Sequence, residues 1–360
     1  MRLLLVPALM LIAALFVPGH TAAEPADVAT AVGRWESVPL PDEVADPPLE
    51  LSPGPVIFRR LLYHPRHPEI VFALSQWALW QSADGGHTWQ NLGIMVCEDS
   101  EVYLDPNDPL TLYVEPRVSY SAVRRTFDGG RTWEHLERPI PGFRLFRADP
   151  ERSGRLYGGN WTGLMASDDF GDSWYIMREG RTGMREGRTG FATVTRGSPS
   201  TLYTTELAPE DYDGGMGALH RSTDDGATWE PCDLPAGAEW LGGHSALWVD
   251  PSFAPGLYAT DAEGVLYYSP DRGSHWEARP RVPYWSGESG LAVSPAQQHL
   301  LYSWNTWTGA LARSTDGGYT WQRLVLPDSV SGGAFIPHPR NPLGGYCLYA
   351  YWDRAAGRSR

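Results

Sequence analysis

The sequence predicts an all-β protein built from many short strands. Of its 360 residues, 42% are hydrophobic and 12% are aromatic, and the aromatic residues include 16 Trp and 17 Tyr. The 39 Gly and 31 Pro provide frequent turns, and no long stretch has the apolar periodicity of an amphipathic helix. A chain of this length can bury a large core. Many aromatic residues and many turn residues together favour short strands joined by tight turns.

An eight-residue pattern, Ser/Thr-x-Asp-x-Gly-x-x-Trp, recurs six times and marks an internal repeat. Its copies end at Trp89, Trp133, Trp174, Trp229, Trp276 and Trp321, which gives spacings of 44, 41, 55, 47 and 45 residues. A second marker, a turn resembling Asp-Pro followed by Leu-Tyr or a similar pair, occurs seven times between these copies. A period in the forties with turn signals inside each unit is typical of a four-stranded β-propeller blade. The seven Leu-Tyr markers predict a seven-bladed propeller.

The aspartates of the six copies are expected to be structural. A carboxylate in this position can accept backbone N–H bonds across a hairpin turn, while Gly supplies a positive φ and Trp packs against the next blade. Six copies around a ring cannot all form one active site. The predicted turn aspartates are Asp84, Asp128, Asp169, Asp224, Asp271 and Asp316.

The N-terminal part of the chain is expected to close the ring. Residues 33–41 read GRWESVPLP and match the residues that end the other repeats, as in YTWQRLVLP. They would form the outer strand of a last blade begun by residues 333–352, which removes exposed strand edges. The third strand of that blade stays open between the segments AAGRSR and DVATAV.

Residues 1–23 are expected to be a secretory signal peptide. Arg2 precedes an apolar run over residues 3–17, and small residues stand before Glu24. We therefore expect residues 24–360 to form one secreted or periplasmic β-propeller domain. Only three cysteines are present, Cys97, Cys232 and Cys347, so disulfides are not expected to be the framework, although one pair would be compatible with the count.

The net charge of −14 argues against a nucleic-acid partner. No second apolar run is long enough to span a membrane. Motifs for a metal, a nucleotide phosphate or a nucleophile elbow are absent, so we expect no cofactor and no metal. We expect a monomer whose partner is a glycan or a protein. The identical heptads MREGRTG at residues 177–190 are interpreted as a surface-loop insertion. The alternative is a mobile basic loop with Arg178, Arg181, Arg185 and Arg188.

The repeats SADGGHTW and STDGGYTW resemble Asp-box (BNR) repeats. Such repeats occur in sialidases, in xyloglucanase-type glycoside hydrolases, in sortilin-type receptors and in a photosystem II assembly factor. The intervening pattern, Asp-Pro followed by Leu-Tyr, looks closer to the sortilin and xyloglucanase types. The resemblance implies the fold, but unrelated activities share that fold.

Candidate ligand contacts come from loops after the second and fourth strands of each blade, which share one face of a propeller. Flat aromatic rings with nearby carboxylates suit a glycan or a protein ligand. The predicted ligand-binding residues are Trp161, Trp307, Trp285, Tyr212, Asp213, Glu206 and Glu288.

A binding or scaffold module is the favoured function, with a glycoside hydrolase as the alternative. Resemblance to sialidases would require an arginine cluster and a Tyr–Glu nucleophile pair. Arg59 or Arg60 stands near the expected place, and Arg144 and Arg147 could face the central channel, but no nucleophile pair is identifiable. Resemblance to xyloglucanases implies two catalytic carboxylates between two propellers, whereas this chain has the length of one. No catalytic residue is therefore assigned.

Overall fold

The computed structural model describes the chain in segments. These are residues 10–14, 38–39, 58–75, 78–96, 100–115, 122–160, 163–179, 192–195, 200–207, 216–232, 247–252, 255–261, 263–285, 289–305, 308, 310–324, 330–338, 340–342, 345–353 and 358–359. Every regular element in these segments is a β-strand, as the sequence predicts. Accordingly, this part of the chain has no helix long and apolar enough to cross a membrane.

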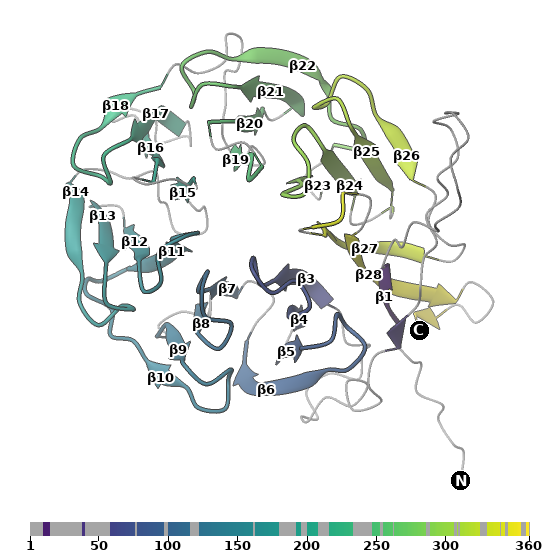
Figure 1. Ribbon diagram of the computed structural model, residues 1–360, viewed down its shortest axis with the longest axis horizontal. Helices are drawn as coiled ribbons and strands as arrows, with labels where there is room; N and C mark the ends of the chain where they lie inside the picture. Colours follow the sequence, from purple (N-terminus) through teal and green to yellow (C-terminus); the bar gives the residue numbers. More distant parts are fainter. Residues whose placement is uncertain are drawn as a thin grey trace.

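Six four-stranded antiparallel sheets succeed one another around a common centre (Figure 1). In each sheet the first strand in sequence lies nearest the centre and the fourth lies at the periphery. In chain order the blades are β3 (Phe58–Tyr63), β4 (Val71–Ser75), β5 (Ala78–Ser82) and β6 (Gln90–Met95); β7 (Glu101–Leu104), β8 (Leu112–Glu115), β9 (Arg124–Thr126) and β10 (Glu134–His135); β11 (Arg144–Ala148), β12 (Leu156–Asn160), β13 (Gly163–Ser167) and β14 (Tyr175–Glu179); β15 (Ala192–Val194), β16 (Leu202–Leu207), β17 (Met216–Ser222) and β18 (Glu230–Pro231); β19 (Leu247–Val249), β20 (Leu257–Thr260), β21 (Val265–Ser269) and β22 (Glu277–Arg281); and β23 (Ser289–Val293), β24 (Leu301–Asn305), β25 (Leu311–Ser314) and β26 (Gln322–Leu324).

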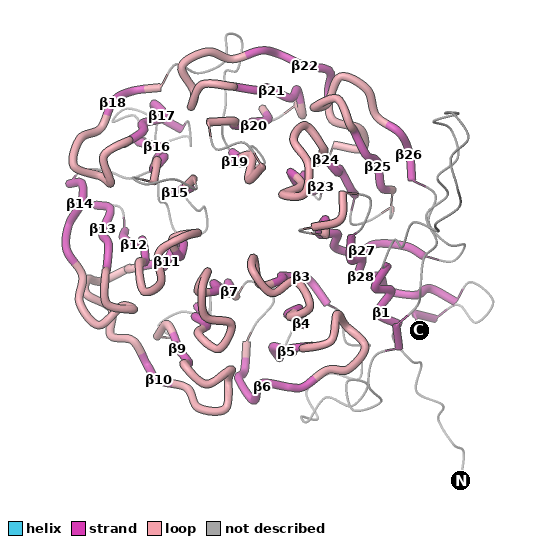
Figure 2. The backbone as a smooth tube through the Cα atoms, viewed as in Figure 1, coloured by secondary structure: helices cyan, strands magenta, loops and turns pink. Residues whose placement is uncertain are grey.

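Loops join the strands within and between the blades (Figure 2), and antiparallel pairing within each blade sorts these loops onto two faces. The turns between first and second strands, and the Asp boxes between third and fourth strands, lie on what we call the box face. The loops between second and third strands, and those leading to the next blade, lie on the opposite side, the loop face. The Asp boxes and the loops that lead to the next blade therefore lie on opposite faces.

The prediction of seven four-stranded blades is wrong, because the described residues form six. The seventh Leu-Tyr marker falls in β28 (Gly345–Asp353), which pairs with β27 (Val330–Pro337). In every other blade an Asp box joins the third and fourth strands. The strand that follows β28 in the described chain pairs with it over only two residues and without a box, so this sheet is not completed in the way of the other blades.

The remaining edge of β28 is paired in a different way. β1 (Met10–Ala14) lies beside β28, and β2 (Val38–Pro39) pairs with β1. Of the segment 33–41, the described part is therefore β2, which does not pair with β28 itself. β29 (Arg358–Ser359), from the segment AAGRSR, pairs with β28 over two residues. β1 falls within the residues expected to form a signal peptide, and that expectation remains a prediction.

The β27–β28 sheet closes the ring between the last blade and the first (Figure 1). The Tyr302 hydroxyl, on β24, donates to the carbonyl of Pro342 at 2.8 Å. On the other side, the Arg340 guanidinium donates to the carbonyl of Arg66 at 2.6 Å, across 274 residues of sequence. These two contacts join the segment between β27 and β28 to the blades on both sides.

Each Asp box is a hairpin turn locked by its carboxylate. In the first box, Asp84 accepts bonds from the Ser82 hydroxyl, the Thr88 backbone N–H and the Thr88 hydroxyl, all at 2.7–2.8 Å. The carboxylates of Asp128, Asp169, Asp224 and Asp316 accept the same three bonds, and at Asp271 the ring of His275 replaces the second hydroxyl. The box thus satisfies its own backbone, which is why it can recur with different neighbours.

The common spacing inside the boxes also builds the joints between blades. Gly226 has a φ of 90°, and a Cβ there would collide with the Met177 side chain of the preceding blade. Met177 stands three residues after the box tryptophan of its blade. Leu136, in the matching position after Trp133, contacts Gly171 in the same way. Glycine is needed both for the turn conformation and for the close approach of the neighbouring blade.

Candidate ligand-binding face

Most of the predicted ligand contacts lie outside the described residues. These are Trp161, Tyr212, Asp213, Glu288 and Trp307. Glu206 belongs to β16, near the end of that strand at the loop face. Cys97 and residues 180–190 of the duplicated heptads also lie outside the described segments, whereas residues 177–179 belong to strand β14 and not to a loop. Cys232 is a buried cysteine.

Trp285, the remaining predicted contact, is half-buried and packs on its own blade. Its ring lies over Gly264, where a Cβ would collide with it. It also packs against the apolar cluster that contains Leu266 and Val282. The Trp285 indole N–H is buried and meets no hydrogen-bond acceptor among the described residues. Part of this ring therefore serves packing at the loop face.

Asp261, another loop-face carboxylate, is occupied by its own turn. It accepts the Val265 N–H at 2.8 Å and the Tyr267 hydroxyl at 3.0 Å. Burial and the neighbouring Asp261 carboxylate raise the pKa of Tyr267 to about 12, so this hydroxyl stays protonated as a donor. The pair closes the β20–β21 turn.

The structure brings together charged residues that the sequence analysis left unconnected. Arg60 on β3 donates to the carboxylate of Glu101 on β7, so the ion pair joins the innermost strands of neighbouring blades. Glu101 lies opposite Glu115 in the β7–β8 register. The two carboxylates therefore stand together at the loop-face end of this blade.

A second part of the cluster surrounds Glu115, whose side chain is 1% exposed. The Arg144 guanidinium on β11 lies 3.8 Å from the Glu115 carboxylate. Burial lowers the pKa of Arg138, in the loop before β11; the Glu115 charge opposes this shift and the Arg144 charge adds to it. Arg138 thus interacts electrostatically with both groups.

We define the arginine cluster as Arg60, Arg138 and Arg144 with Glu101 and Glu115. Arg147 lies on the same face of β11 as Arg144, two register positions nearer the box face. β11 has a register irregularity between Leu145 and Arg147. Arg144 is partly exposed and Arg147 is exposed, whereas Leu145 between them is buried. Such a bulge re-aims side chains. Arg147 forms no ion pair with another described residue, so its charge is available to a ligand.

The repeat spacing of the sequence relates two members of this cluster. Arg60 and Glu101 are 41 residues apart, which is about one repeat, so they occupy comparable positions in successive blades. Arg60, Arg144 and Arg147 were candidates from sequence, but their acidic neighbours were not. Within the described residues, no group of three or more His, Cys, Asp or Glu side chains could hold a metal ion.

Comparisons with known proteins agree with this architecture. The family model for the BNR/Asp-box repeat matches residues 312–323. A xyloglucanase from Paenibacillus sp. is 28% identical over 276 residues, which cover 69% of this chain and 23% of that protein. The chain therefore spans about a quarter of the length of the curated relatives it matches.

Two solved structures share the fold. YCF48 bound to D1 peptide superposes with a TM-score of 0.54 at 19% identity, over 85% of this chain and 95% of that one. The GH74 xyloglucanase from Xanthomonas campestris gives a TM-score of 0.55 at 19% identity, over 85% of this chain and 54% of that one. The repeats, the family model and the ring of blades agree: the chain is a β-propeller of the BNR/Asp-box repeat type.

Proposed function

We propose that this propeller is a binding module whose ligand contacts the loop face at the arginine cluster. The observation that carries the proposal is the local charge. Three arginines meet two glutamates there, in a chain whose net charge is −14. A cationic site on an acidic protein attracts an anionic ligand and steers it to that site.

A protein segment bearing carboxylates fits this cluster better than a neutral polysaccharide does. A guanidinium binds a carboxylate through two parallel N–H···O bonds. A neutral glucan of the kind for which the xyloglucanase relatives are named would leave these charges unmatched. The YCF48 structure, which shares the fold, is described as bound to a peptide, and this supports a protein ligand.

Aromatic residues predicted on the same face would complete the site. Trp161 comes directly after β12, whose residue Gly159 pairs with Arg144. A carboxylate held by arginine beside a flat ring is a common recognition arrangement, because aromatic and arginine side chains dominate binding energies at interfaces. The function would be exercised outside the cytoplasm, after export directed by residues 1–23.

The glycoside hydrolase alternative has support from the xyloglucanase relatives but less from this site. Glycoside hydrolysis needs two carboxylates flanking the scissile bond, one of them acting as an acid. The two described carboxylates of the cluster, Glu101 and Glu115, both face guanidinium groups. Such contacts suit recognition and structure more than proton donation.

The test replaces Arg147 with Glu, because Arg147 is exposed and its loss breaks no described ion pair. Arg131→Glu, at an exposed position in an Asp box, is the matched control with the same change in net charge. We expect fluorescent peptides ending in Asp or Glu to bind the wild-type protein. Arg147→Glu should weaken that binding at least tenfold, and Arg131→Glu should leave it unchanged.

Two results would count against the proposal. Equal weakening by the two variants would mean that only net charge matters. Release of reducing sugars from xyloglucan, or of the fluorophore from a fluorogenic sialoside, by the purified protein would instead favour the hydrolase.

A further inference from the structure

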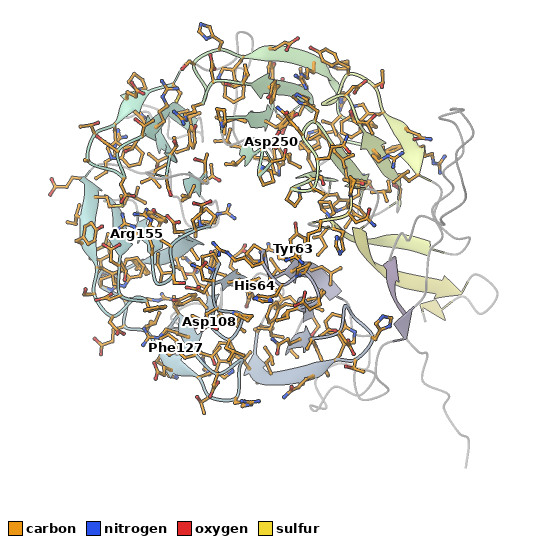
Figure 3. The ribbon with its side chains drawn as sticks, in the orientation of Figure 1. Tyr63, His64, Asp108, Phe127, Arg155 and Asp250 are labelled. Atoms are coloured by element: carbon orange, nitrogen blue, oxygen red, sulfur yellow. The ribbon has the colours of Figure 1, made fainter. Side chains whose placement is uncertain are left out.

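A group of exposed apolar side chains lies on the box face, opposite the proposed ligand site. Leu110 is 47% exposed and Phe127 is 43% exposed. The Phe127 ring meets the ring of Phe170, in the box of the next blade, edge to face at 5.5 Å. We call Leu110, Phe127 and Phe170 the Phe127 patch; Figure 3 marks Phe127 at the β9–β10 side of its blade.

The box does not require an aromatic residue at position 127. Phe127 is the residue between the hydroxyl residue and the aspartate of its box. In the other boxes this position holds Ala83, Asp168, Thr223, Pro270 and Thr315. None of these residues is aromatic, and the hairpin bonds are the same. Folding of the box therefore does not explain the exposed phenylalanine.

Phe170 is unusual for a different reason. Its φ is 62°, at a position where three other boxes have glycine. A bulky residue in this left-handed conformation costs stability. Some of that cost is offset because the ring covers Gly154 and packs into the neighbouring apolar cluster. The rest of the ring extends the patch across the boundary between two blades.

Among the charged groups beside the patch, two carboxylates are exposed and an arginine is buried. The Arg125 guanidinium lies 4.5 Å from the Phe127 ring centre, and its side chain is only 8% exposed. Its partners are Glu134 at 2.8 Å and Asp172 at 2.9 Å, which are 59% and 66% exposed. Two exposed carboxylates therefore lie beside the patch, while the arginine that they bind is buried.

We propose that the Phe127 patch docks a protein segment that carries apolar side chains flanked by lysine or arginine. Exposed apolar clusters rimmed by charge mark interaction sites, and complementary charge selects the partner. A second copy of this chain is a poor occupant, because two molecules of net charge −14 would bring like-charged rims together. The patch would leave the loop face free, so one propeller could hold two partners.

The test uses Phe127→Thr, because Thr is the residue that stands in this position in two other boxes. Tyr319→Thr, at an exposed aromatic on the last Asp box, is the control. The probes are three fluorescent twelve-residue peptides: Lys alternating with Leu and Phe, Glu alternating with Leu and Phe, and Lys alternating with Ser. Binding is measured by anisotropy, urea unfolding checks the fold, and sedimentation gives the oligomeric state.

We expect only the peptide that combines Lys with Leu and Phe to bind. Phe127→Thr should weaken its binding at least tenfold with an unchanged urea midpoint, and Tyr319→Thr should have no effect. Binding unaffected by Phe127→Thr, preference for the Glu peptide, or failure of all three peptides to bind would overturn the proposal. So would a wild-type dimer that becomes monomeric in Phe127→Thr, because the occupant would then be a second copy.

Discussion

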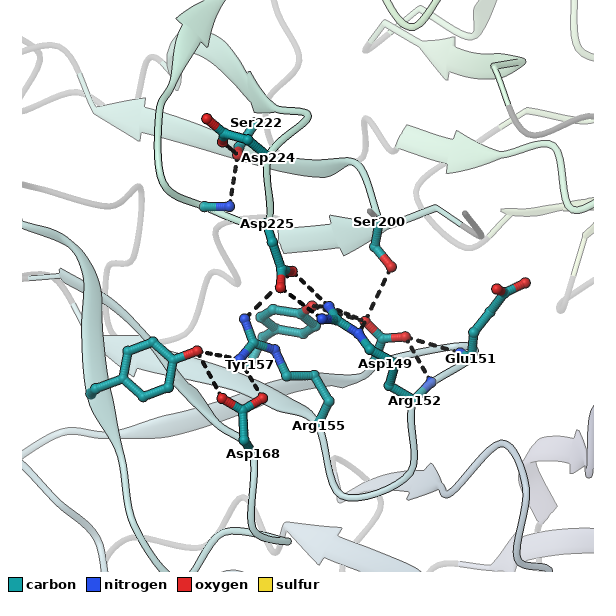
Figure 4. Close-up of polar contacts among 12 residues, drawn as sticks. Asp149, Glu151, Arg152, Arg155, Tyr157, Asp168, Ser200, Ser222, Asp224 and Asp225 are labelled. Atoms are coloured by element: carbon teal, nitrogen blue, oxygen red, sulfur yellow. Dashed lines mark hydrogen bonds and ion pairs between the residues drawn. The ribbon is translucent and has the colours of Figure 1, made fainter. Parts of the chain in front are cut away.

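Arg152 and Asp225 form a two-point ion pair across a blade boundary, with both N–H···O distances at 2.6 Å (Figure 4). Arg152 stands in the turn after β11, and Asp225 stands in the Asp box after β17. Arg152 also donates to the fully buried carboxylate of Asp149, which accepts the Tyr157 hydroxyl at 2.9 Å. These contacts tie blades together on the box face, on the side of the ring opposite the proposed ligand site.

The Arg152–Asp225 pair should show measurable coupling in a double-mutant cycle. The double variant Arg152→Gln/Asp225→Asn should lose less free energy of unfolding than the sum of the losses in the two single variants. We expect the difference, the coupling energy, to be about 1 kcal/mol. The side chains are 40% and 32% exposed, so solvent screening keeps the value in the range of surface pairs. Urea unfolding of the four proteins gives the coupling, and a value near zero would show the pair to be incidental.

Stability should fall on acidification below pH 4, because the box aspartates are ionised in the folded state. Hydrogen bonds from Thr132 lower the pKa of Asp128 to about 2. Burial opposes ionisation of Asp316, but hydrogen bonds from Thr320 and Ser314 outweigh it and also give a pKa of about 2. A lowered folded pKa means that stability is fully present above pH 4 and is lost as the pH falls towards 2.

The measurement is the urea midpoint between pH 5 and pH 2.5. Asp316→Asn should be less stable at pH 5 and should show a smaller further loss on acidification than the wild-type protein. An identical pH dependence in the variant and the wild type would contradict the role given to this carboxylate.

Replacing Gly226, at the joint between two blades, should lower the free energy of unfolding. Gly226→Ala forces a side chain into a backbone with φ of 90° and into contact with Met177. We expect a loss of about 2 kcal/mol, of which about 1 kcal/mol reflects backbone strain alone. In the Met177→Ala background the loss should shrink towards the strain alone. An unchanged loss there would mean that the neighbouring blade does not press on this glycine.

The predicted loop-face tryptophans should matter for binding more than for folding. Replacing Trp161 and Trp307 together with Ala should leave the melting temperature nearly unchanged, because loop residues are not needed to hold the strands together. Binding of the acidic peptides should weaken. Thermal unfolding and anisotropy check both statements, and unfolding of the double variant would assign these rings to the core.

The sequence by itself determines the blade. The Asp box carries its own carboxylate, hydroxyl, glycine and tryptophan within eight residues, so its hydrogen bonds are local and can be anticipated from the pattern. Gly226 and Gly171 are predictable on the same ground, because a positive φ in a tight turn is a local requirement.

Only the tertiary structure decides how many blades form and what the loop face presents. The seventh Leu-Tyr marker indicates a strand, β28, but β28 pairs with β27 and with β1, and β1 lies over 300 positions away in the sequence. The contact between Arg340 and Arg66 likewise joins residues that are 274 positions apart in the sequence. Arg60 meets Glu101, and Arg144 meets Glu115, because successive blades stack around one axis. Long-range stacking of this kind leaves no local pattern, since the pairing partners are set by the closure of the ring.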